Sequence, residues 1–176
     1  MLAATDSLTG LYNRRAFTDR VDAYLHGLAL APQPHHGALL VADVDNFKSI
    51  NDSFGHDQGD RALKAIAETI ANILRPGDIV ARIGGEEFGI LLPGASVVQI
   101  RTLSEAVRRA VSDLRFEPDG KPTSLSVSIG VATFQHAVGF SDLFRVADQQ
   151  LYLAKQNGRN RISVSPADTN EKPLAA

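Results

Sequence analysis

The 176-residue sequence predicts an α+β fold, a sandwich in which helices cover a central, mostly antiparallel β-sheet. Short apolar runs typical of strands alternate with longer segments whose apolar residues recur every three or four positions, as in amphipathic helices. One pair of strands is separated only by a glycine turn, which is typical of a hairpin. The resulting order β-α-β-β-α-β is that of a ferredoxin-like kernel, here with extra helices.

Five segments are predicted to be strands, at residues 37–44, 78–83, 88–92, 124–134 and 161–164. The first is apolar and ends at Asp43 and Asp45, as expected of a buried strand whose end reaches the surface. The second and third flank Gly84 and Gly85 and form the predicted hairpin. The fourth alternates in polarity and contains β-branched residues, which favour strands.

Five helices are predicted: residues 14–28, a short helix that starts near Phe47, a long helix around 63–74, residues 97–114, and a last helix between Ser141 and Gly158. The long helix has the clearest single apolar stripe. Ser141 is expected to cap the N-terminus of the last helix, and Gly158 suits the position after its C-terminus.

The chain is predicted to be one domain at residues 1–165, followed by a flexible polar tail at 166–176. It has no cysteine, which excludes disulfides, thiolate metal sites and a cysteine nucleophile. A formal charge of −2 argues against binding to nucleic acid. No apolar run approaches the roughly 18 residues of a membrane span, and the N-terminus lacks a signal-peptide pattern. We therefore expect a soluble, cytoplasmic domain without membrane contact.

Two acidic clusters are the main candidates for chemistry. Asp43 and Asp45 end the first strand, and Glu86 and Glu87 lie at the hairpin turn. If these strands are neighbours, the carboxylates converge at one edge of the sheet, where their repulsion favours a cation. Hard oxygen ligands of this kind suit Mg²⁺, which leaves further positions to water and phosphate. The alternative is that these acids simply face solvent at strand ends and in a turn.

The hairpin turn and four other blocks resemble one known family. The sequence GGEEF at residues 84–88 resembles the signature loop of the GGDEF family, the diguanylate cyclases. The other blocks follow in the family's order: DSLTGLYNRR at 6–15, DVDNFKSINDSFGHDQGD at 43–60, SIGVA at 128–132 and DQQLYLAKQNGRN at 148–160. Within the first of these, we expect Asp6, Asn13 and Arg14 to be structural and to tie the N-terminal segment to the domain.

The resemblance implies a fold like that of nucleotide cyclases and polymerase palms, and a defined reaction. In the family, two GTP molecules on two facing domains condense to cyclic di-GMP and release pyrophosphate, so a homodimer is needed for catalysis. It implies two Mg²⁺ ions per active site, with Mn²⁺ as an alternative, held by Asp43, Glu86 and the carbonyl of Val44. Glu87 is a further candidate for metal binding or proton handling, and Lys48 for catalysis.

Substrate contacts are also implied by the resemblance. The phosphate contacts are the backbone amides of Asn46 and Phe47 and the cationic side chains of Lys48, Lys155 and Arg159; the guanine contacts are Asn51 and Asp60. Taken without the family, Lys155 and Arg159 are better explained as helix C-terminal charges that complement the dipole. Likewise, Asn51 and Asp60 could be turn and capping residues near Gly55 and Gly59.

The segment from Arg75 to Asp78 has two interpretations. Pro76 followed by Gly77 between a helix and a strand is typical of a type II turn. The Arg-x-x-Asp spacing, shortly before the paired glycines, resembles the family's inhibitory product site, which implies that Arg75 and Asp78 bind cyclic di-GMP. Both interpretations hold together if the turn presents the two side chains.

The sequence therefore favours a product-inhibited diguanylate cyclase. The main alternative is a catalytically silent module that senses GTP or cyclic di-GMP, although such modules usually lack the signature acids. A palm-like enzyme acting on another nucleotide is a third interpretation, and it depends on fold analogy alone. The resemblance also allows for a sensory module upstream in a parent protein.

Overall fold

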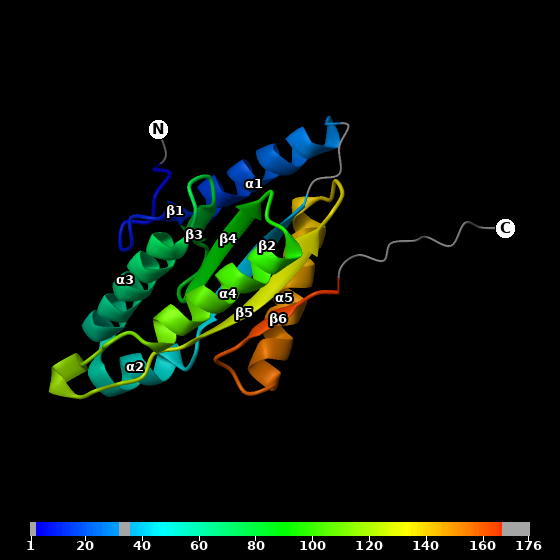
Figure 1. The fold of residues 1–176 in the computed structure, drawn as a ribbon. Coiled ribbons are helices and arrows are strands. Elements are labelled where there is room, and N and C mark those ends of the chain that lie inside the picture. Colours follow the sequence, from blue (N-terminus) through cyan, green and yellow to red (C-terminus); the bar gives the residue numbers. More distant parts are fainter. Residues whose placement is uncertain (1–2, 32–35, 167–176) are drawn as a thin grey trace.

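The computed structural model describes residues 3–31 and 36–166, which form a sheet flanked by helices (Figure 1). In the described residues the elements are β1 (Tyr12–Asn13), α1 (Arg14–Ala29), β2 (Gly37–Val44), α2 (Phe47–Phe54), α3 (His56–Ile73), β3 (Ile79–Arg82), β4 (Glu87–Pro93), α4 (Val97–Ser112), a 3₁₀ turn (Pro118–Gly120), β5 (Val127–Phe134), α5 (Phe140–Gln156) and β6 (Ile162–Val164). All but residue 166 of the predicted tail lies outside the described residues. Over the described ranges, no helix combines the length and the apolar character that crossing a membrane requires.

The strands form one mixed sheet in the order β1-β3-β4-β2-β5-β6. The four kernel strands, β3, β4, β2 and β5, are antiparallel to one another where they pair, and β2 lies between β4 and β5. This confirms the ferredoxin-like kernel and the β3–β4 hairpin. The outer strands β1 and β6 pair in parallel with β3 and β5. Because β1 has only two residues, it has no alternation from which it could be predicted.

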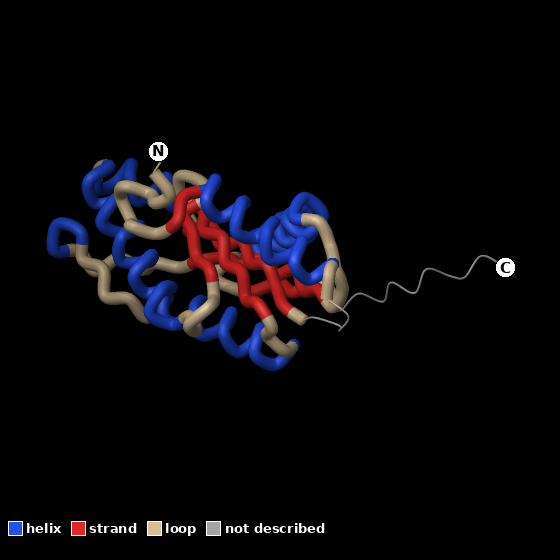
Figure 2. The backbone as a smooth tube through the Cα atoms, turned by 90° about the horizontal axis from the view of Figure 1, so that it is seen from above, coloured by secondary structure: helices blue, strands red, loops and turns tan. Residues whose placement is uncertain are grey.

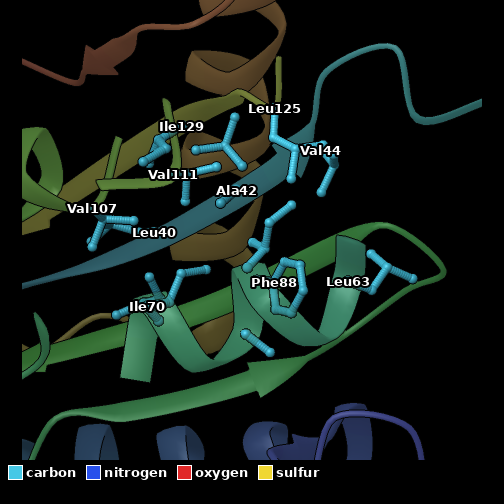
Figure 3. Close-up of a cluster of buried hydrophobic side chains, with 14 of the residues drawn as sticks. Leu40, Ala42, Val44, Leu63, Ile70, Phe88, Val107, Val111, Leu125 and Ile129 are labelled. Carbon is cyan, nitrogen blue, oxygen red and sulfur yellow. The ribbon is translucent and has the colours of Figure 1, made fainter. Parts of the chain in front are cut away.

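Helices cover both faces of the sheet, as Figure 2 shows from above. Successive β2 residues point to opposite faces, so Leu40 and Ala42 pack with α2, α3 and α4, whereas Leu39 and Val41 pack with α1 and α5. Figure 3 shows the first of these two cores around Phe88. Burial of β2 on both sides explains why its sequence is apolar without alternation. By the same alternation, Asp43 lies on the α1 and α5 face.

Helix α5 lies unusually close to the sheet. A Cβ atom at Gly130 of β5 would overlap the backbone oxygen of Ala147 and the backbone nitrogen of Leu151. The main chains of β5 and α5 therefore pack against each other directly. The helix starts two residues earlier than expected, since the N-cap is Gly139 and not Ser141; Gly139 makes no side-chain hydrogen bond, so the predicted capping by Ser141 is wrong. Its C-terminus is as predicted, with Gly158 at φ +116° after the cap.

Candidate active site

The two acidic clusters meet where β2 ends beside the β3–β4 turn. Asp43 is the register partner of Glu87, and the amide of Val44 donates to the carbonyl of Glu86 at 3.1 Å. The hairpin closes with the amides of Ile83 and Gly84 both donating to the carbonyl of Glu87, at 2.9 and 3.3 Å. Strand pairing alone therefore brings the two clusters together.

A pocket of about 190 Å³ lies at this junction. It is lined by Asp43, Val44, Asp45, Asn46, Phe47, Lys48, Glu86, Lys155 and Arg159. Residues from β2, the start of α2, the signature loop and the end of α5 thus face one small volume that holds both acidic and basic groups. A wider hollow of about 710 Å³ between α1 and the loop before α5 is lined mainly by apolar residues, with Asp22 and His26 as the only titratable side chains among its described residues.

Burial and mutual repulsion dominate the electrostatics of the pocket. Asp43 is 7% exposed, and burial raises its pKa, although Lys155, whose Nζ lies 3.2 Å from Asp43 Oδ2, opposes the rise. Burial raises the pKa of Glu86 and of Glu87 as well, and the charge of Asp43 adds to both increases. A bound cation would relieve this repulsion, so the donor set fits a hard divalent ion.

The geometry also limits how such an ion would be held. Within residues 3–31 and 36–166, no cluster of three or more acidic or histidine side chains has the arrangement of a complete metal site. Asp43 and Glu86 can supply two carboxylates, so backbone carbonyl, water and phosphate oxygens must provide the remaining ligands. This is the usual arrangement for Mg²⁺ in sites that handle phosphates.

Asp45 has a different role from the one its sequence position suggests. Its Oδ1 accepts from the Ser128 hydroxyl at 2.6 Å, and its Oδ2 accepts from the Ser126 hydroxyl at 2.7 Å and the Asn160 amide at 2.9 Å. Both oxygens are thus occupied by donors from β5 and from the segment before it and the loop after α5. Both aspartates line the pocket, but the Asp45 carboxylate is held by hydrogen bonds within the protein, whereas Asp43 pairs only with Lys155 among the described residues.

The start of α2 forms another wall of the pocket. Asn46 precedes the helix in a left-handed conformation, with φ 52°, and its side chain makes no capping bond. Phe47 is buried, and its side chain anchors this turn in the core. Lys48 is exposed and pairs with Asp52 one turn later at 3.1 Å, a contact that a stronger anion could displace.

Asn51 and Asp60 lie on the adjacent α2–α3 pair and do not line the pocket. Asp60 is exposed. The Oδ1 atom of Asn51 is buried and has no hydrogen-bond partner among the described residues. It packs directly over Gly59, where a Cβ atom would overlap it. Because buried polar atoms are nearly always satisfied, this oxygen is suited to a donor from outside the chain.

Gly59→Ala is expected to leave folding intact but to displace the Asn51 amide. Alanine favours a helix over glycine by about 1 kcal/mol, so the melting temperature should hold or rise. The added methyl group occupies the space of Asn51 Oδ1, so if Asn51 contacts guanine, as the sequence resemblance implies, GTP affinity should fall about tenfold. Thermal denaturation and titration with a non-hydrolysable GTP analogue measure the two effects. The inverse control is Ala65→Gly in the same helix, which should lose stability and keep its affinity for the analogue. Unchanged affinity in Gly59→Ala would contradict the predicted contact of Asn51 with guanine.

Arg75 and Asp78 form both a turn and an ion pair. The amide of Asp78 donates to the carbonyl of Arg75 at 3.1 Å, and Gly77 has φ +93°, which confirms the type II turn. Arg75 Nη2 lies 2.7 Å from Asp78 Oδ1 and also donates to the carbonyl of Pro93 at 3.1 Å. The Asp78 side chain is fully buried, whereas that of Arg75 is 31% exposed.

Arg82 was not singled out by the sequence, yet it links the N-terminal segment to the signature loop. Its guanidinium donates to the carbonyl of Gly85 at 2.8 Å and to Asp6 at 3.2 Å. Asn13 caps α1 by accepting from the amide of Ala16, and Arg14 donates to the carbonyl of Ile83 at 3.3 Å. These contacts confirm the structural roles predicted for Asp6, Asn13 and Arg14.

Comparison with known proteins supports a family assignment. Residues 3–161 match the family described as "Diguanylate cyclase, GGDEF domain". The chain is 42% identical to diguanylate cyclase DgcP of Pseudomonas aeruginosa over 93% of its own length and 24% of that protein. It is 40% identical to diguanylate cyclase DgcM of Escherichia coli K12 over 89% of its length and 37% of that protein. The chain thus spans less than half of these curated relatives.

Solved structures give the same result. The GGDEF domain of DgcB from Caulobacter crescentus in complex with c-di-GMP superposes with a TM-score of 0.87 at 32% identity, covering 93% of this chain and 96% of that one. The active GGEEF domain of a diguanylate cyclase from Vibrio cholerae gives 0.80 at 32% identity, covering 89% and 98%. The likeness therefore covers most of this chain and nearly the whole of each solved chain.

Proposed function

Because the chain belongs to the GGDEF family of diguanylate cyclase domains, we propose that it condenses two GTP molecules into cyclic di-GMP with release of pyrophosphate. The observation that carries this proposal is the pocket in which Asp43 and Glu86 face Lys155 and Arg159. In each half-reaction a 3′-oxygen bonds to the α-phosphorus of the other GTP, the bond from that phosphorus to pyrophosphate breaks, and the hydroxyl proton leaves. Catalysis of such transfers consists mainly of positioning and charge neutralisation.

Asp43 and Glu86, together with the carbonyl of Val44, are the residues that would hold divalent cations. When bound, Mg²⁺ or Mn²⁺ neutralises phosphate charge and acidifies an attacking hydroxyl. Glu87 pairs in register with Asp43, and burial and that charge raise its pKa, which suits a group that takes up a proton. Glu86 and Glu87 differ in that Glu86 alone lines the pocket.

The basic residues of the pocket would bind the triphosphate. Lys155 is paired with Asp43 in the structure, and its ammonium would be available to phosphate oxygens if Asp43 held a divalent cation. Arg159 approaches from the loop after α5, and Lys48 from α2. The first amides of α2, at Asn46 and Phe47, add donors of the kind that helix N-termini offer to phosphates.

Asn51 and Asp60 would read the base. Guanine carries N1–H and N2–H donors, and a carboxylate such as Asp60 accepts both of them. The buried Asn51 oxygen without a partner supports a ligand donor at this place. Adenine would leave Asp60 facing a lone pair, which such sites reject strongly.

The reaction requires two copies of the domain, because one pocket holds one GTP. Activity per protein should therefore rise with protein concentration when GTP and Mg²⁺ are in excess, since encounter limits the rate. Release of pyrophosphate and formation of cyclic di-GMP, measured from nanomolar to high micromolar protein, test both the activity and the half-site arrangement. GTP binding without pyrophosphate release at any concentration would favour a silent sensor. Flat specific activity from a protein that remains monomeric would contradict the half-site arrangement.

Arg75 and Asp78 are proposed as an inhibitory product site. Arg75 is partly exposed and already oriented by Asp78 through Nε and Nη2, so its Nη1, which has no hydrogen-bond partner among the described residues, can donate charge-assisted bonds to cyclic di-GMP. Such bonds contribute about 1.5–3 kcal/mol each, so Arg75→Ala should weaken product binding about tenfold or more. GTP turnover should persist in this variant without feedback inhibition.

Arg75→Lys is the matched control for the product site. Lysine retains a cation beside the buried Asp78 and preserves folding, but its single ammonium cannot pair with Asp78 and also supply the separate Nη1 donor that a phosphate or guanine would use. Calorimetric titration of cyclic di-GMP should therefore show weakened binding in both Arg75→Ala and Arg75→Lys. The melting temperature of Arg75→Lys should be close to that of the wild type. Equal product affinity in wild type and both variants would mean that the segment is only a turn.

A further inference from the structure

The loop that follows α5 has an uncommon backbone. Arg159 and Asn160 adopt left-handed conformations in succession, with φ 60° and 45°. Residues other than glycine seldom adopt such angles, so other contacts must hold them there. Since Arg159 lines the pocket, the conformation of this loop determines where its guanidinium lies.

Asn160 is held from two sides by residues far away in the sequence. Its amide donates to Asp45 Oδ2 at 2.9 Å, and its side-chain Oδ1 accepts from Arg108 Nη1 at 2.9 Å. Asp45 follows β2, and Arg108 lies on α4. The loop is therefore held between the end of the central strand β2 and helix α4, which packs on the face of the sheet opposite to α5.

Both anchors are themselves fixed. The Ser126 and Ser128 hydroxyls orient Asp45. Arg108 is 17% exposed, and its Nε and Nη2 donate to Glu105 at 3.0 and 2.6 Å, which leaves Nη1 directed to Asn160. The Arg108 guanidinium thus binds Glu105 of its own helix through Nε and Nη2, and Asn160 of the loop through Nη1.

We propose that Arg108 and Asp45 are positioning residues that act through Asn160 to hold Arg159 in the geometry that receives the triphosphate. This inference rests on the proposed function, and it adds that α4 takes part in substrate affinity without touching the substrate. Arg108 does not line the pocket, and both Asp45 oxygens are occupied by donors. We call the contacts of Asp45 and Arg108 with Asn160 the brace. Without the brace, the loop would have to be ordered when GTP binds. Affinity for the phosphates would therefore fall, while affinity for the base would not.

Arg108→Ala tests the brace, with Arg109→Ala as its matched control. Arg109 is the next residue on α4 and also contacts Glu105, but its side chain is 72% exposed and it makes no contact with Asn160. Each protein is titrated with a non-hydrolysable GTP analogue and with guanosine. We expect Arg108→Ala to bind the analogue about tenfold more weakly and guanosine as wild type does, the scale typical of lost outer-shell partners. Arg109→Ala should match wild type for both ligands.

A double variant tests the route through Arg159. If Arg108 acts by positioning Arg159, Arg108→Ala should add no further loss of analogue affinity to an Arg159→Ala protein. Additive losses, or an Arg108→Ala protein that behaves like Arg109→Ala, would overturn the inference. If Arg108→Ala does not fold, Asn160→Gly removes the same contact while suiting the left-handed backbone, and it should give the same selective loss.

Amide hydrogen exchange separates this inference from the proposed function. The Asn160 amide donates to Asp45, so its exchange in the nucleotide-free protein should accelerate in Arg108→Ala and not in Arg109→Ala. Unchanged exchange would overturn the brace whatever the nucleotide results. If wild type binds the analogue no better than guanosine while exchange does accelerate, the proposed function fails and the phosphate role of the brace fails with it.

Discussion

Glu86→Gln is expected to lower turnover at least about 100-fold, which corresponds to some 2.7 kcal/mol of activation free energy. The substitution preserves the shape of the side chain but removes one of the two pocket carboxylates proposed to hold cations. Burial and the charge of Asp43 raise the pKa of Glu86, so neutralising it relieves repulsion in the metal-free protein. The melting temperature without metal should therefore hold or rise while activity is lost. Steady-state pyrophosphate release and thermal denaturation measure the two effects.

The control for this prediction is Glu68→Gln. Glu68 is an exposed glutamate on α3 outside the pocket, so the same change of charge there should leave both activity and stability near wild type. Varying Mg²⁺ sharpens the test, because Glu86→Gln should also need more Mg²⁺ for half-maximal activity. A Glu86→Gln enzyme that keeps most of its turnover at the wild-type Mg²⁺ requirement would show that the cations are held elsewhere.

Discrimination between GTP and ATP should be large and should depend on Asp60. Sites built on hydrogen bonds reject analogues that leave their polar groups unpaired by about 10⁴ or more, so ATP turnover should be lower by that order. Asp60→Ala should make the kcat/KM values for GTP and ATP similar, mainly by lowering the value for GTP. Ratios of kcat/KM for GTP and ATP in wild type and variant measure this effect.

Asp57→Ala separates base recognition from a helix effect. Asp57 and Asp60 are both exposed near the start of α3, where acidic residues stabilise the helix dipole by typically less than about 1 kcal/mol. If Asp60 contributes only through the helix, the two alanine variants should lose similar stability and keep the preference for GTP. Guanine recognition predicts that only Asp60→Ala loses the preference.

The sequence predicted the kernel and the meeting of the acidic clusters because both follow from local patterns. The apolar run of β2 and the glycine turn of the β3–β4 hairpin specify buried and paired strands. Once β2 lies beside β4, the opposition of Asp43 and Glu87 follows from register alone. The turn at Gly77 was predictable for the same reason, since its conformation depends on neighbouring residues.

Contacts between distant residues could not be predicted from the sequence. The bonds from Asn160 to Asp45 and to Arg108 join positions 115 and 52 residues apart, and no local pattern marks them. Asp45 resembled a pocket acid because it lies two residues from Asp43, and only the three donors around it reveal another role. The early start of α5 at Phe140 also depends on packing, because Gly139 offers no side-chain cap that a pattern could show.

The direct contact between Gly130 and α5 makes the protein unequally tolerant of mutation. Substituted side chains in the surrounding core can change rotamer or shift neighbours, which typically costs up to about 3 kcal/mol and stays local. The contact between β5 and α5 at Gly130 is different, because it is made by main-chain atoms that have no rotamer to change. Since α5 carries Lys155 and β2, the neighbour of β5, carries Asp43, this main-chain contact helps to set the spacing of the two groups. Position 130 is the exception, because even one added methyl group there must move the helix and the site together.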